Sequence, residues 1–360
     1  MTPRELAGAL LVAGFSGTSL APRTAVALER GERAGVVLFR RNLPDLAALA
    51  RIAEQTRAAS LLHGSAVPLV AIDEEGGRVS RLPAPEVKLP PMRRVGTLGS
   101  ADLARRAGLA VGARLAALGV NLDFAPVLDV DSNPMNPVIG DRSFSSEPEA
   151  CARLGLAFAD GLRAGGVLPC GKHFPGHGDT DKDSHHDLPV LSHDRARLDA
   201  VELAPFREAA RAGLETIMSA HVVIRALDEG RPATLSRRVM TDLLRTEIGF
   251  DGVLVSDDLE MRAVADRYPI DERAIGAVTA GCDALLICSD EDLADAAHAA
   301  LTAEIESSAA FAARCREAAS RMAALRRRAA SLHEARAERA PSIADVVLEI
   351  EEAERARGAS

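Results

Sequence analysis

The chain alternates eight times between a short apolar run and a segment with helical periodicity. Each run is rich in β-branched or other apolar residues, and in the residues that follow it apolar side chains recur three or four positions apart. The runs are ALLVAG (9–14), GVVLF (35–39), PLVAI (68–72), VNLDFA (120–125), VLPCG (167–171), TIMSA (216–220), GVLVS (252–256) and ALLIC (284–288). Eight strand–helix units predict a parallel sheet that closes into an α/β fold, a (β/α)8 barrel of the TIM type.

The segment 100–118 shows the helical pattern most clearly. Ser100 is a candidate N-cap with Asp102 in the first turn, and one apolar stripe follows, made of Leu103, Ala107, Val111, Leu115 and Leu118. An open, doubly wound sheet is the alternative, but it would usually stop at about six strands and carry a Gly-rich phosphate turn after its first strand. GFSGTS (14–19) lacks the G-x-G-x-x-G spacing, so we favour the barrel and expect no nucleotide cofactor.

Residues after Cys288 contain no further strand pattern and are rich in Ala, Glu and Arg. The sequence AAFAARCREAASRMAALRRRAASLHEA (309–335) predicts one long helix, Pro341 interrupts the pattern, and IADVVLEIEEAERA predicts another. We expect these extra C-terminal helices to close the barrel or to lie at its periphery. The chain is then one catalytic domain over 1–360, with strands at about 9–288 and helices at 289–360.

Composition and charge exclude several classes of partner. Apolar residues make up 47% of the chain, which is enough for a sizeable core, and the net charge is −9 with no basic stripe. Nucleic acids and anionic membranes are therefore poor partners. The apolar stretch near the start, LAGALLVAGF (6–15), is too short to span a bilayer and is followed by no clear cleavage site, so it predicts a buried first strand.

The cysteines and aromatic residues indicate a compartment and a kind of ligand. The five cysteines are odd in number and form no C-x-x-C pair, which is typical of reduced thiols in a cytoplasmic protein. The chain has no Trp and one Tyr, so it lacks the flat rings on which long polysaccharides usually stack. Any sugar ligand should be small and held by polar groups.

Polar residues follow five consecutive predicted strands, where a barrel of this type carries its chemistry. They are Asp73 after the third strand, Asp129 and Arg142 after the fourth, Lys172 and His173 after the fifth, His221 after the sixth, and Asp257 and Asp258 after the seventh. Strand ends are where polar residues begin in any protein, but five in succession predict a site at this end of the barrel.

The loop KHFPGHGDTDKDSHHDLP (172–189) holds four histidines and four aspartates. It could hold a metal ion, carry acid–base chemistry, or be a solvated connection. Pro175 and Gly176 prevent the helix that would place His173 and His177 on one face, so we expect no metal, and turn formers do not explain four histidines. Asp183 and His185 are two positions apart, close enough for the carboxylate to orient the imidazole as an acid/base.

This loop closely resembles the corresponding loop of family 3 glycoside hydrolases of the β-N-acetylglucosaminidase type. Further matching segments, in the same order, are AIDEEGGRVSRLP (71–83), NLDFAPVLDV (121–130), NPVIGDRSFS (136–145) and PATLSRRVMTDLLRTEIGFDGVLVSDDLEM (232–261). The resemblance runs from about residue 10 to residue 290 and implies a retaining glycosidase on a TIM barrel.

The resemblance also implies roles for individual residues. Asp257 in SDDLEM matches the nucleophile, while Asp183 and His185 match an Asp–His dyad whose histidine is the general acid/base. The positions that hold the hydroxyls of the terminal N-acetylglucosamine are matched by Asp73, Arg81, Arg142, Lys172 and His173. The implied substrate is a small saccharide or muropeptide, N-acetylglucosamine linked to anhydro-N-acetylmuramic acid, cleaved in the cytoplasm during peptidoglycan recycling.

Alternation along the seventh strand separates its two aspartates. Val253, Val255 and Asp257 share one face, so Asp258 on the other face is expected to support the site or to cap a turn. Gly176 and Gly178 predict a loop that moves and carries His185 over bound substrate.

Other polar residues receive less specific interpretations. His221 could line the pocket or be a satisfied core histidine, and Glu74 and Glu75 are interpreted as surface or turn residues. Cys170 is expected to serve packing. Three further histidines are expected at the surface: His63, His298 and His333.

Three alternative functions remain open. A phosphorylase on the same barrel would use phosphate in place of water, because a histidine acid/base leaves the entrance less anionic than a glutamate would. A non-catalytic sugar-binding barrel is less compatible with the presence of Asp257, Asp183 and His185 together. A metal-dependent hydrolase would lose activity on chelation.

Overall fold

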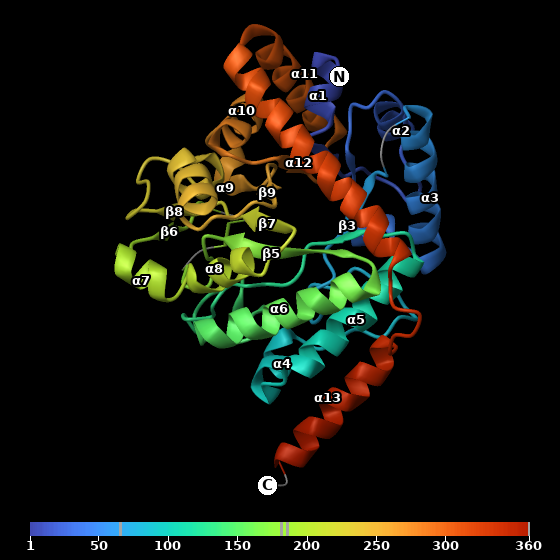
Figure 1. Ribbon diagram of the computed structural model, residues 1–360, viewed down its shortest axis with the longest axis vertical. Coiled ribbons are helices and arrows are strands. Elements are labelled where there is room, and N and C mark those ends of the chain that lie inside the picture. Colours follow the sequence, from blue (N-terminus) through green and yellow to red (C-terminus); the bar gives the residue numbers. More distant parts are fainter. Residues whose placement is uncertain (65–66, 181–182, 185–186, 359–360) are drawn as a thin grey trace.

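The computed structural model describes residues 1–64, 67–180, 183–184 and 187–358, and its centre is a closed barrel of eight parallel strands (Figure 1). The order around the barrel is β1-β10-β9-β7-β5-β4-β3-β2. Their bounds are β1 Leu11–Ala13, β2 Gly35–Leu38, β3 Leu69–Ile72, β4 Leu122–Asp123, β5 Leu168–Phe174, β7 Thr216–Ser219, β9 Val253–Asp258 and β10 Ala284–Ile287. The predicted (β/α)8 barrel is therefore confirmed, with each strand inside or overlapping its predicted run.

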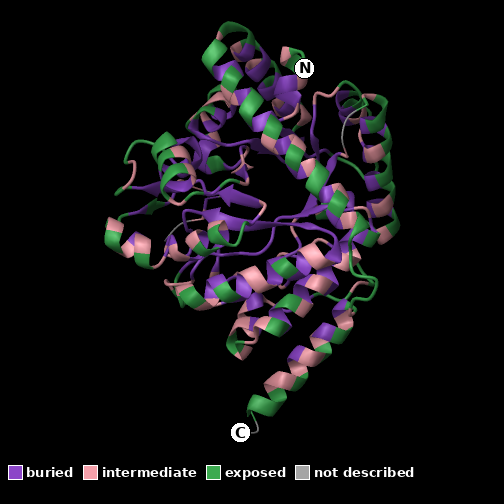
Figure 2. Ribbon diagram, viewed as in Figure 1, coloured by how far each residue is buried: buried purple, intermediate pink, exposed green. Residues whose placement is uncertain are grey.

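Helices cover the outside of the barrel and turn their buried faces toward it (Figure 2). Their bounds are α1 Pro3–Gly8, α2 Pro22–Glu29, α3 Leu46–Leu62, α4 Met92–Leu98, α5 Ala101–Ala117, α6 Pro148–Gly165, α7 Arg195–Ala200, α8 Ala204–Arg211, α9 Arg262–Ala265, α10 Ile270–Ala280 and α11 Glu291–Ser307; β7 is followed by a π-helix, η4 Arg238–Glu247. The predicted cap of α5 is present, since the Ser100 hydroxyl accepts a hydrogen bond from Leu103 N at 3.2 Å.

A long helix, α12 (Ala309–Glu334), closes the amino-terminal end of the barrel. It crosses the molecule in Figure 1 and contributes four buried side chains to the interior core of the barrel: Met322, Leu325, Ala329 and Leu332. Arg326 Nε donates to the carbonyl of Val67, just before β3, at 2.8 Å. The predicted barrel-closing role therefore belongs to α12.

A buried charge cluster fixes α12 to this closed end. The side chain of Asp283, just before β10, is fully buried and pairs with Arg314 at 2.7 Å, with Arg321 at 3.4 Å, and with Arg245. Arg314 also donates to the carbonyls of the loop before Asp283, at 2.8 and 2.9 Å. One carboxylate thus joins three arginines from η4 and α12.

The last helix, α13 (Ile343–Gly358), lies at the periphery against α4 and α5. Its buried side chains are Ile343, Val346 and Ile350, and Glu349 pairs with Arg106 of α5 at 2.9 Å. Among the described residues, no helix is both long and apolar enough to cross a membrane.

A second, two-stranded parallel sheet joins the loops that follow β5 and β7. It pairs β6 (Val190–Leu191) with β8 (Val223–Ile224), and the sequence did not predict it because each strand has only two residues.

Some polar residues that were expected to follow the barrel strands lie within the strands instead. Lys172 and His173 belong to β5, and Asp257 and Asp258 to β9, so these side chains are held by the barrel itself.

Candidate active site

A pocket of about 170 Å³ opens at the carboxyl ends of the barrel strands. Six of the predicted site residues line it: Asp73, Arg81, Arg142, Lys172, His173 and Asp257. They come from β5, β9 and the loops after β3 and β4, so the structure brings together residues that are far apart in sequence. The remaining lining includes apolar side chains such as Phe39, Val138 and Met261.

A buried ion-pair network forms one wall of the pocket. Lys172 Nζ lies 2.7 Å from Asp73 Oδ1 and 2.6 Å from Glu75 Oε1. Arg142 donates to both carboxylate oxygens of Glu75, each at 2.8 Å, in a bidentate pair. Arg81 lies 3.6 Å from the second oxygen of Asp73. Each cation therefore has a fixed position from which it can also meet a ligand oxygen.

In this wall, burial and ion pairing shift the pKa values of the side chains in opposite directions. Burial alone would raise the pKa of the Glu75 carboxyl, but Arg142 and Lys172 hold that pKa well below its usual range. Burial alone would lower the pKa of Lys172, and Asp73 and Glu75 raise it instead. Glu75 and Lys172 therefore stay charged at neutral pH, which suits a site that holds neutral hydroxyls through charge-assisted hydrogen bonds.

The interpretation of Glu74 and Glu75 as surface residues was wrong, since both are buried. The Glu74 carboxylate accepts from Arg81 N at 2.7 Å and Leu82 N at 3.0 Å, so it does shape a turn and thereby places Arg81. Glu75 is a pocket residue that sequence reasoning missed. Its position two residues after Asp73 was the available signal, because alternation continued past the end of a strand would place both side chains on one side.

Asp129 organises the histidines that follow Lys172. Its buried carboxylate lies 2.7 Å from His173 Nδ1 and accepts from His177 N at 2.7 Å. Although burial alone would raise it, His173 and His177 lower the pKa of Asp129. His177 also lines the pocket, and burial lowers its pKa to about 4, so its ring is neutral at physiological pH.

The two aspartates at the end of β9 have different surroundings. Asp257 Oδ1 accepts from Asp258 N at 2.8 Å, and Asp257 N lies 3.3 Å from Ser219 Oγ. Asp258 Oδ1 accepts from Glu260 N at 3.0 Å and Cys288 N at 3.2 Å, which fits the expected turn-supporting role. Burial, with Glu260 nearby, raises the pKa of Asp258 to about 7. Asp258 also lines the pocket, beside Asp257.

The loop after β5 begins as a tightly packed turn. Gly176 has a φ of +128°, and a Cβ on Gly178 would lie 1.8 Å from the carbonyl oxygen of Val130. Both glycines therefore have a steric reason to be there, and they do not by themselves indicate mobility. Asp183 is half-buried, and its carbonyl accepts from Asp187 N at 3.0 Å. His185 lies outside the described residues, so the Asp183–His185 dyad stays a prediction.

His221 is a satisfied core histidine that does not line this pocket. Its ring nitrogens lie 2.8 Å from Thr234 Oγ1 and 2.9 Å from the carbonyl oxygen of Asp258, so it supports the end of β9.

Two other residues with less specific predictions lie outside the pocket. Cys170 points into the barrel core, as expected for packing, and burial raises the pKa of its thiol to about 12. The prediction for His298 was wrong, because it is buried and bonded to the carbonyl of Arg4 at 2.9 Å.

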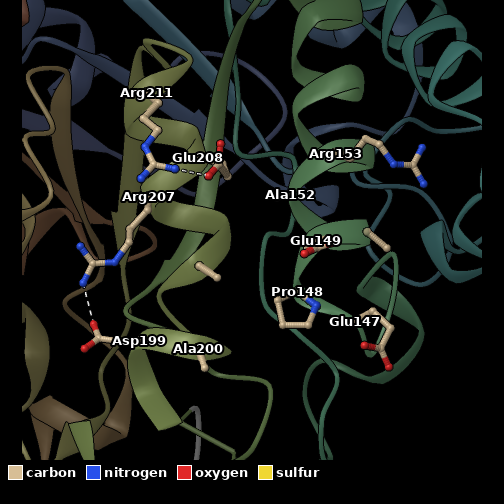
Figure 3. A pocket seen from close by; sticks show the side chains of 12 residues that line it. Glu147, Pro148, Glu149, Ala152, Arg153, Asp199, Ala200, Arg207, Glu208 and Arg211 are labelled. Carbon is tan, nitrogen blue, oxygen red and sulfur yellow. Dashed lines mark hydrogen bonds and ion pairs between the residues drawn. The ribbon is translucent and has the colours of Figure 1, made fainter. Parts of the chain in front are cut away.

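A larger cavity of about 630 Å³ lies away from these residues, between α6 and the α7–α8 segment. Figure 3 shows two ion pairs in its lining, between Arg207 and Asp199 (2.6 Å) and between Arg211 and Glu208. It contains none of the predicted site residues. The predicted site residues therefore point to the smaller pocket at the end of the barrel and not to this cavity.

Among the described residues, one group has spacing suited to a metal ion: Asp179, His193 and Glu202. His193 Nε2 is hydrogen-bonded to Asp179, and Arg197 lies 3.9 Å from Asp179 and 3.3 Å from Glu202, so each of these three side chains already has a partner within the protein. His173 and His177 use their Nδ1 atoms on Asp129 and Thr180. These contacts favour hydrogen bonding over metal binding in the described part of the loop.

Comparisons with known proteins agree with the pocket. The sequence pattern described as "Glycosyl hydrolase family 3 N terminal domain" matches residues 10–325. The chain is 42% identical over 273 residues to a β-hexosaminidase of Chromobacterium violaceum, covering 74% of this chain and 75% of that one. It is 39% identical over 293 residues to a β-hexosaminidase of Nitrosomonas eutropha, covering 79% and 82%.

Solved structures show the same relationship. A family 3 β-N-acetylglucosaminidase from Paenibacillus sp. FPU-7 superposes with a TM-score of 0.91 at 39% identity, over 98% of this chain and 69% of that one. A β-N-acetylhexosaminidase from Beutenbergia cavernae superposes with a TM-score of 0.84 at 33% identity, over 91% and 98%. With this match over most of its length and a polar pocket at the end of its barrel, the chain belongs to glycosyl hydrolase family 3 and is a glycoside hydrolase.

Proposed function

We propose that this glycoside hydrolase is a retaining β-N-acetylglucosaminidase that releases terminal N-acetylglucosamine from small saccharides or muropeptides. One observation carries the proposal: the five residues expected to hold the sugar share a single pocket with Asp257, the expected nucleophile. The relatives described as β-hexosaminidases and a β-N-acetylglucosaminidase support the choice of sugar.

The wall of ion pairs accounts for binding. Lys172, Arg142 and Arg81 would donate to the hydroxyl oxygens of the terminal sugar, while Asp73 would accept from its hydroxyl protons. His173, oriented by Asp129, would complete the set. A pocket of about 170 Å³ suits one sugar unit rather than a chain, in keeping with the absence of Trp. The leaving group would then project toward solvent.

Hydrolysis would proceed in two steps. Asp257 attacks the anomeric carbon, the glycosidic bond breaks, and the leaving oxygen takes a proton from the histidine of the Asp183–His185 dyad. The same imidazole then removes a proton from water, which attacks the glycosyl–aspartate ester and releases the sugar with its original β configuration. Asp258, with a pKa of about 7, is partly protonated at neutral pH, which limits its repulsion of an ionised Asp257.

The charges in the pocket favour water over phosphate as the acceptor. Among the described lining residues, the cations Arg81, Arg142 and Lys172 face the carboxylates of Asp73 and Glu75 within 3.6 Å. Such paired cations attract a dianion weakly.

A cytoplasmic location is also part of the proposal. The five cysteines, all in the described part of the chain, are free and buried, as is typical of proteins in a reducing compartment.

A labelling experiment tests the proposal. An aryl N-acetyl-β-glucosaminide should be cleaved and the matching aryl β-glucoside should not. A fluorinated N-acetylglucosaminyl donor should leave a covalent adduct on the peptide that contains Asp257, and NMR should show the β-anomer as first product. Added phosphate should yield no sugar 1-phosphate. An adduct on Asp258, or an α-anomer as first product, would contradict the assignment.

A further inference from the structure

His177 is a buried histidine whose backbone and ring are both fixed. Its N–H donates to Asp129 Oδ1 at 2.7 Å, its Nδ1 lies 2.6 Å from Thr180 Oγ1, and its Nε2 lies 3.0 Å from Ser184 Oγ. Only 1% of the residue is exposed. Neither ring nitrogen is therefore directed at a substrate, although the ring lines the pocket.

The hydrogen bonds of Thr180 define the tautomer of this ring. The hydroxyl has one proton, which it donates to the carbonyl of His177 at 3.0 Å. Its oxygen accepts from Asn136 Nδ2 at 3.2 Å and from His177 Nδ1. We assign the ring proton to Nδ1 on the basis of these bonds, which leaves Nε2 as an acceptor for the hydroxyl of Ser184.

Asn136 connects this arrangement to the loop after β4. Its Nδ2 donates to the carbonyls of His177 and Thr180, each at 2.9 Å, and its Oδ1 accepts from Val138 N and Ile139 N at 2.9 and 2.7 Å. His177 is thus attached to two loops at the end of the barrel and forms a rigid support for what its Nε2 holds.

Ser184, the residue that Nε2 holds, is itself buried and lines the pocket. Its carbonyl accepts from Ala263 N, just after β9, at 3.3 Å. In sequence it separates Asp183 from His185. Two elements of the barrel end therefore converge on the residue between the two members of the expected acid/base dyad.

We propose that His177 is a positioning residue for catalysis, which acts through the Ser184 hydroxyl to fix the backbone that carries the Asp183–His185 dyad. The inference rests on the proposed function, because it takes the dyad as the source of the proton. His177 exchanges no proton with the substrate in this scheme. Its Nε2 stays unprotonated and accepts a hydrogen bond throughout the reaction.

The first test compares Ser184→Ala with Ser184→Thr on two substrates. The first substrate has an aglycone that needs protonation, such as a disaccharide, and the second has a nitrophenyl group that leaves without help. Misplacing a catalytic group by about 1 Å can cost roughly 10²-fold. For Ser184→Ala we expect kcat/KM to fall by about that factor on the disaccharide and by less than about 3-fold on the nitrophenyl glycoside. Ser184→Thr, which keeps the hydroxyl, should recover most of the loss.

His221 offers a matched control at the other side of the site. It too is a buried histidine with a partner at each ring nitrogen, but it supports the strand that carries Asp257. His177→Gln should lower kcat/KM selectively on the disaccharide. His221→Gln should lower it about equally on both substrates, because attack by Asp257 is needed whatever the leaving group.

A spectroscopic measurement tests the same arrangement without turnover. In protein with 15N-labelled histidine, the resonances lost on His177→Gln should have the shifts of an Nδ1–H tautomer with an accepting Nε2, and Ser184→Ala should shift the Nε2 signal. An Nε2–H tautomer would overturn the inference, as would equal losses of Ser184→Ala on both substrates. If the wild-type protein cleaved neither substrate, the proposed function would fail instead, and the two failures are distinct.

Discussion

The two ends of the barrel each bury a carboxylate among cationic side chains, and they use this device differently. At the closed end, Asp283 pairs with Arg245, Arg314 and Arg321, two of which come from α12. At the open end, Glu75 pairs with Arg142 and Lys172, which line the substrate pocket. The closed cluster joins secondary-structure elements, whereas the open one presents paired charges to a cavity.

The difference indicates how a barrel separates stability from function. The partners of Asp283 also bond to backbone carbonyls, since Arg314 holds Gly281 and Cys282 and Arg245 holds Phe250. Arg142 likewise donates to the carbonyl of Val138, at 3.2 Å, but it and Lys172 line the pocket and can exchange some of their contacts for those of a ligand. Changes at the closed end should therefore alter unfolding, and changes at the open end should alter turnover.

Asp283→Asn is expected to have the largest effect and to act on stability alone. Removing the carboxylate leaves three arginines without their common partner, and breaking a buried pair in this way typically costs about 3–5 kcal/mol. Urea unfolding should show this loss in the free energy of unfolding, while kcat/KM per folded molecule stays within about 2-fold of wild type. A stable variant with a large loss of kcat/KM would erase the proposed contrast between the two ends.

Glu75→Gln should show the opposite pattern. Glutamine keeps the volume but loses the charge that holds Arg142 in a bidentate pair, so the sugar-binding cations lose their fixed positions. We expect kcat/KM to fall by roughly 10²-fold. The loss of unfolding free energy should be smaller than for Asp283→Asn, because Lys172 keeps its ion pair with Asp73. Steady-state kinetics and urea unfolding of the same preparation give both numbers. Unchanged kinetics would remove Glu75 from the binding wall.

Asp258 links the open end to pH. Its pKa is about 7 in the folded protein, above the ordinary value of 3.8, so the folded state binds this proton more tightly than the unfolded state. The stability that the protonated group contributes is complete below about pH 4 and is lost as pH rises through 7. Relative to Asp258→Asn, the wild type should lose roughly 2.5 kcal/mol of unfolding free energy between pH 5 and pH 8. Parallel pH profiles for the two proteins would contradict the raised pKa.

Arg328→Gln should have the smallest effect and marks the boundary of the closed cluster. Arg328 lies on α12, its side chain is 50% exposed, and its partner Glu215 is 3.4 Å away. Exposed pairs of this kind contribute at most about 1 kcal/mol. Thermal unfolding should change by no more than a few degrees and kcat/KM should not change. A loss as large as that of Asp283→Asn would extend the stabilising cluster to the surface of α12.

Much of the fold follows from local pattern, and the exceptions have physical causes. The eight barrel strands were predictable because apolar runs alternate with helical segments, and the Ser100 cap because capping is a local interaction. The carboxyl ends of β5 and β9 were not, since Lys172, His173, Asp257 and Asp258 are polar residues that continue a buried strand. A barrel can bury such residues only because other loops supply their partners.

The sequence predicted which residues form the site better than it predicted the contacts between them. Asp73, Arg81, Arg142, Lys172, His173 and Asp257 were expected from the resemblance and share a pocket. The burial of Glu75 was missed because its partners, Arg142 and Lys172, lie 67 and about 100 positions away. The support that His177 gives Ser184 was missed for a related reason, since four histidines in one loop suggest several roles before geometry distinguishes them.

The placement of α12 has a consequence for how the protein is made. The barrel interior takes Met322, Leu325, Ala329 and Leu332 from a helix that follows all eight strands in sequence. A chain emerging from the ribosome can therefore pair its strands but cannot keep water out of the barrel floor until residue 332 has emerged. Until that point its apolar interior is open at one end, which is when a chaperone or a neighbouring nascent chain has access to it. The barrel interior is thus covered only after the last turns of α12 have been synthesised.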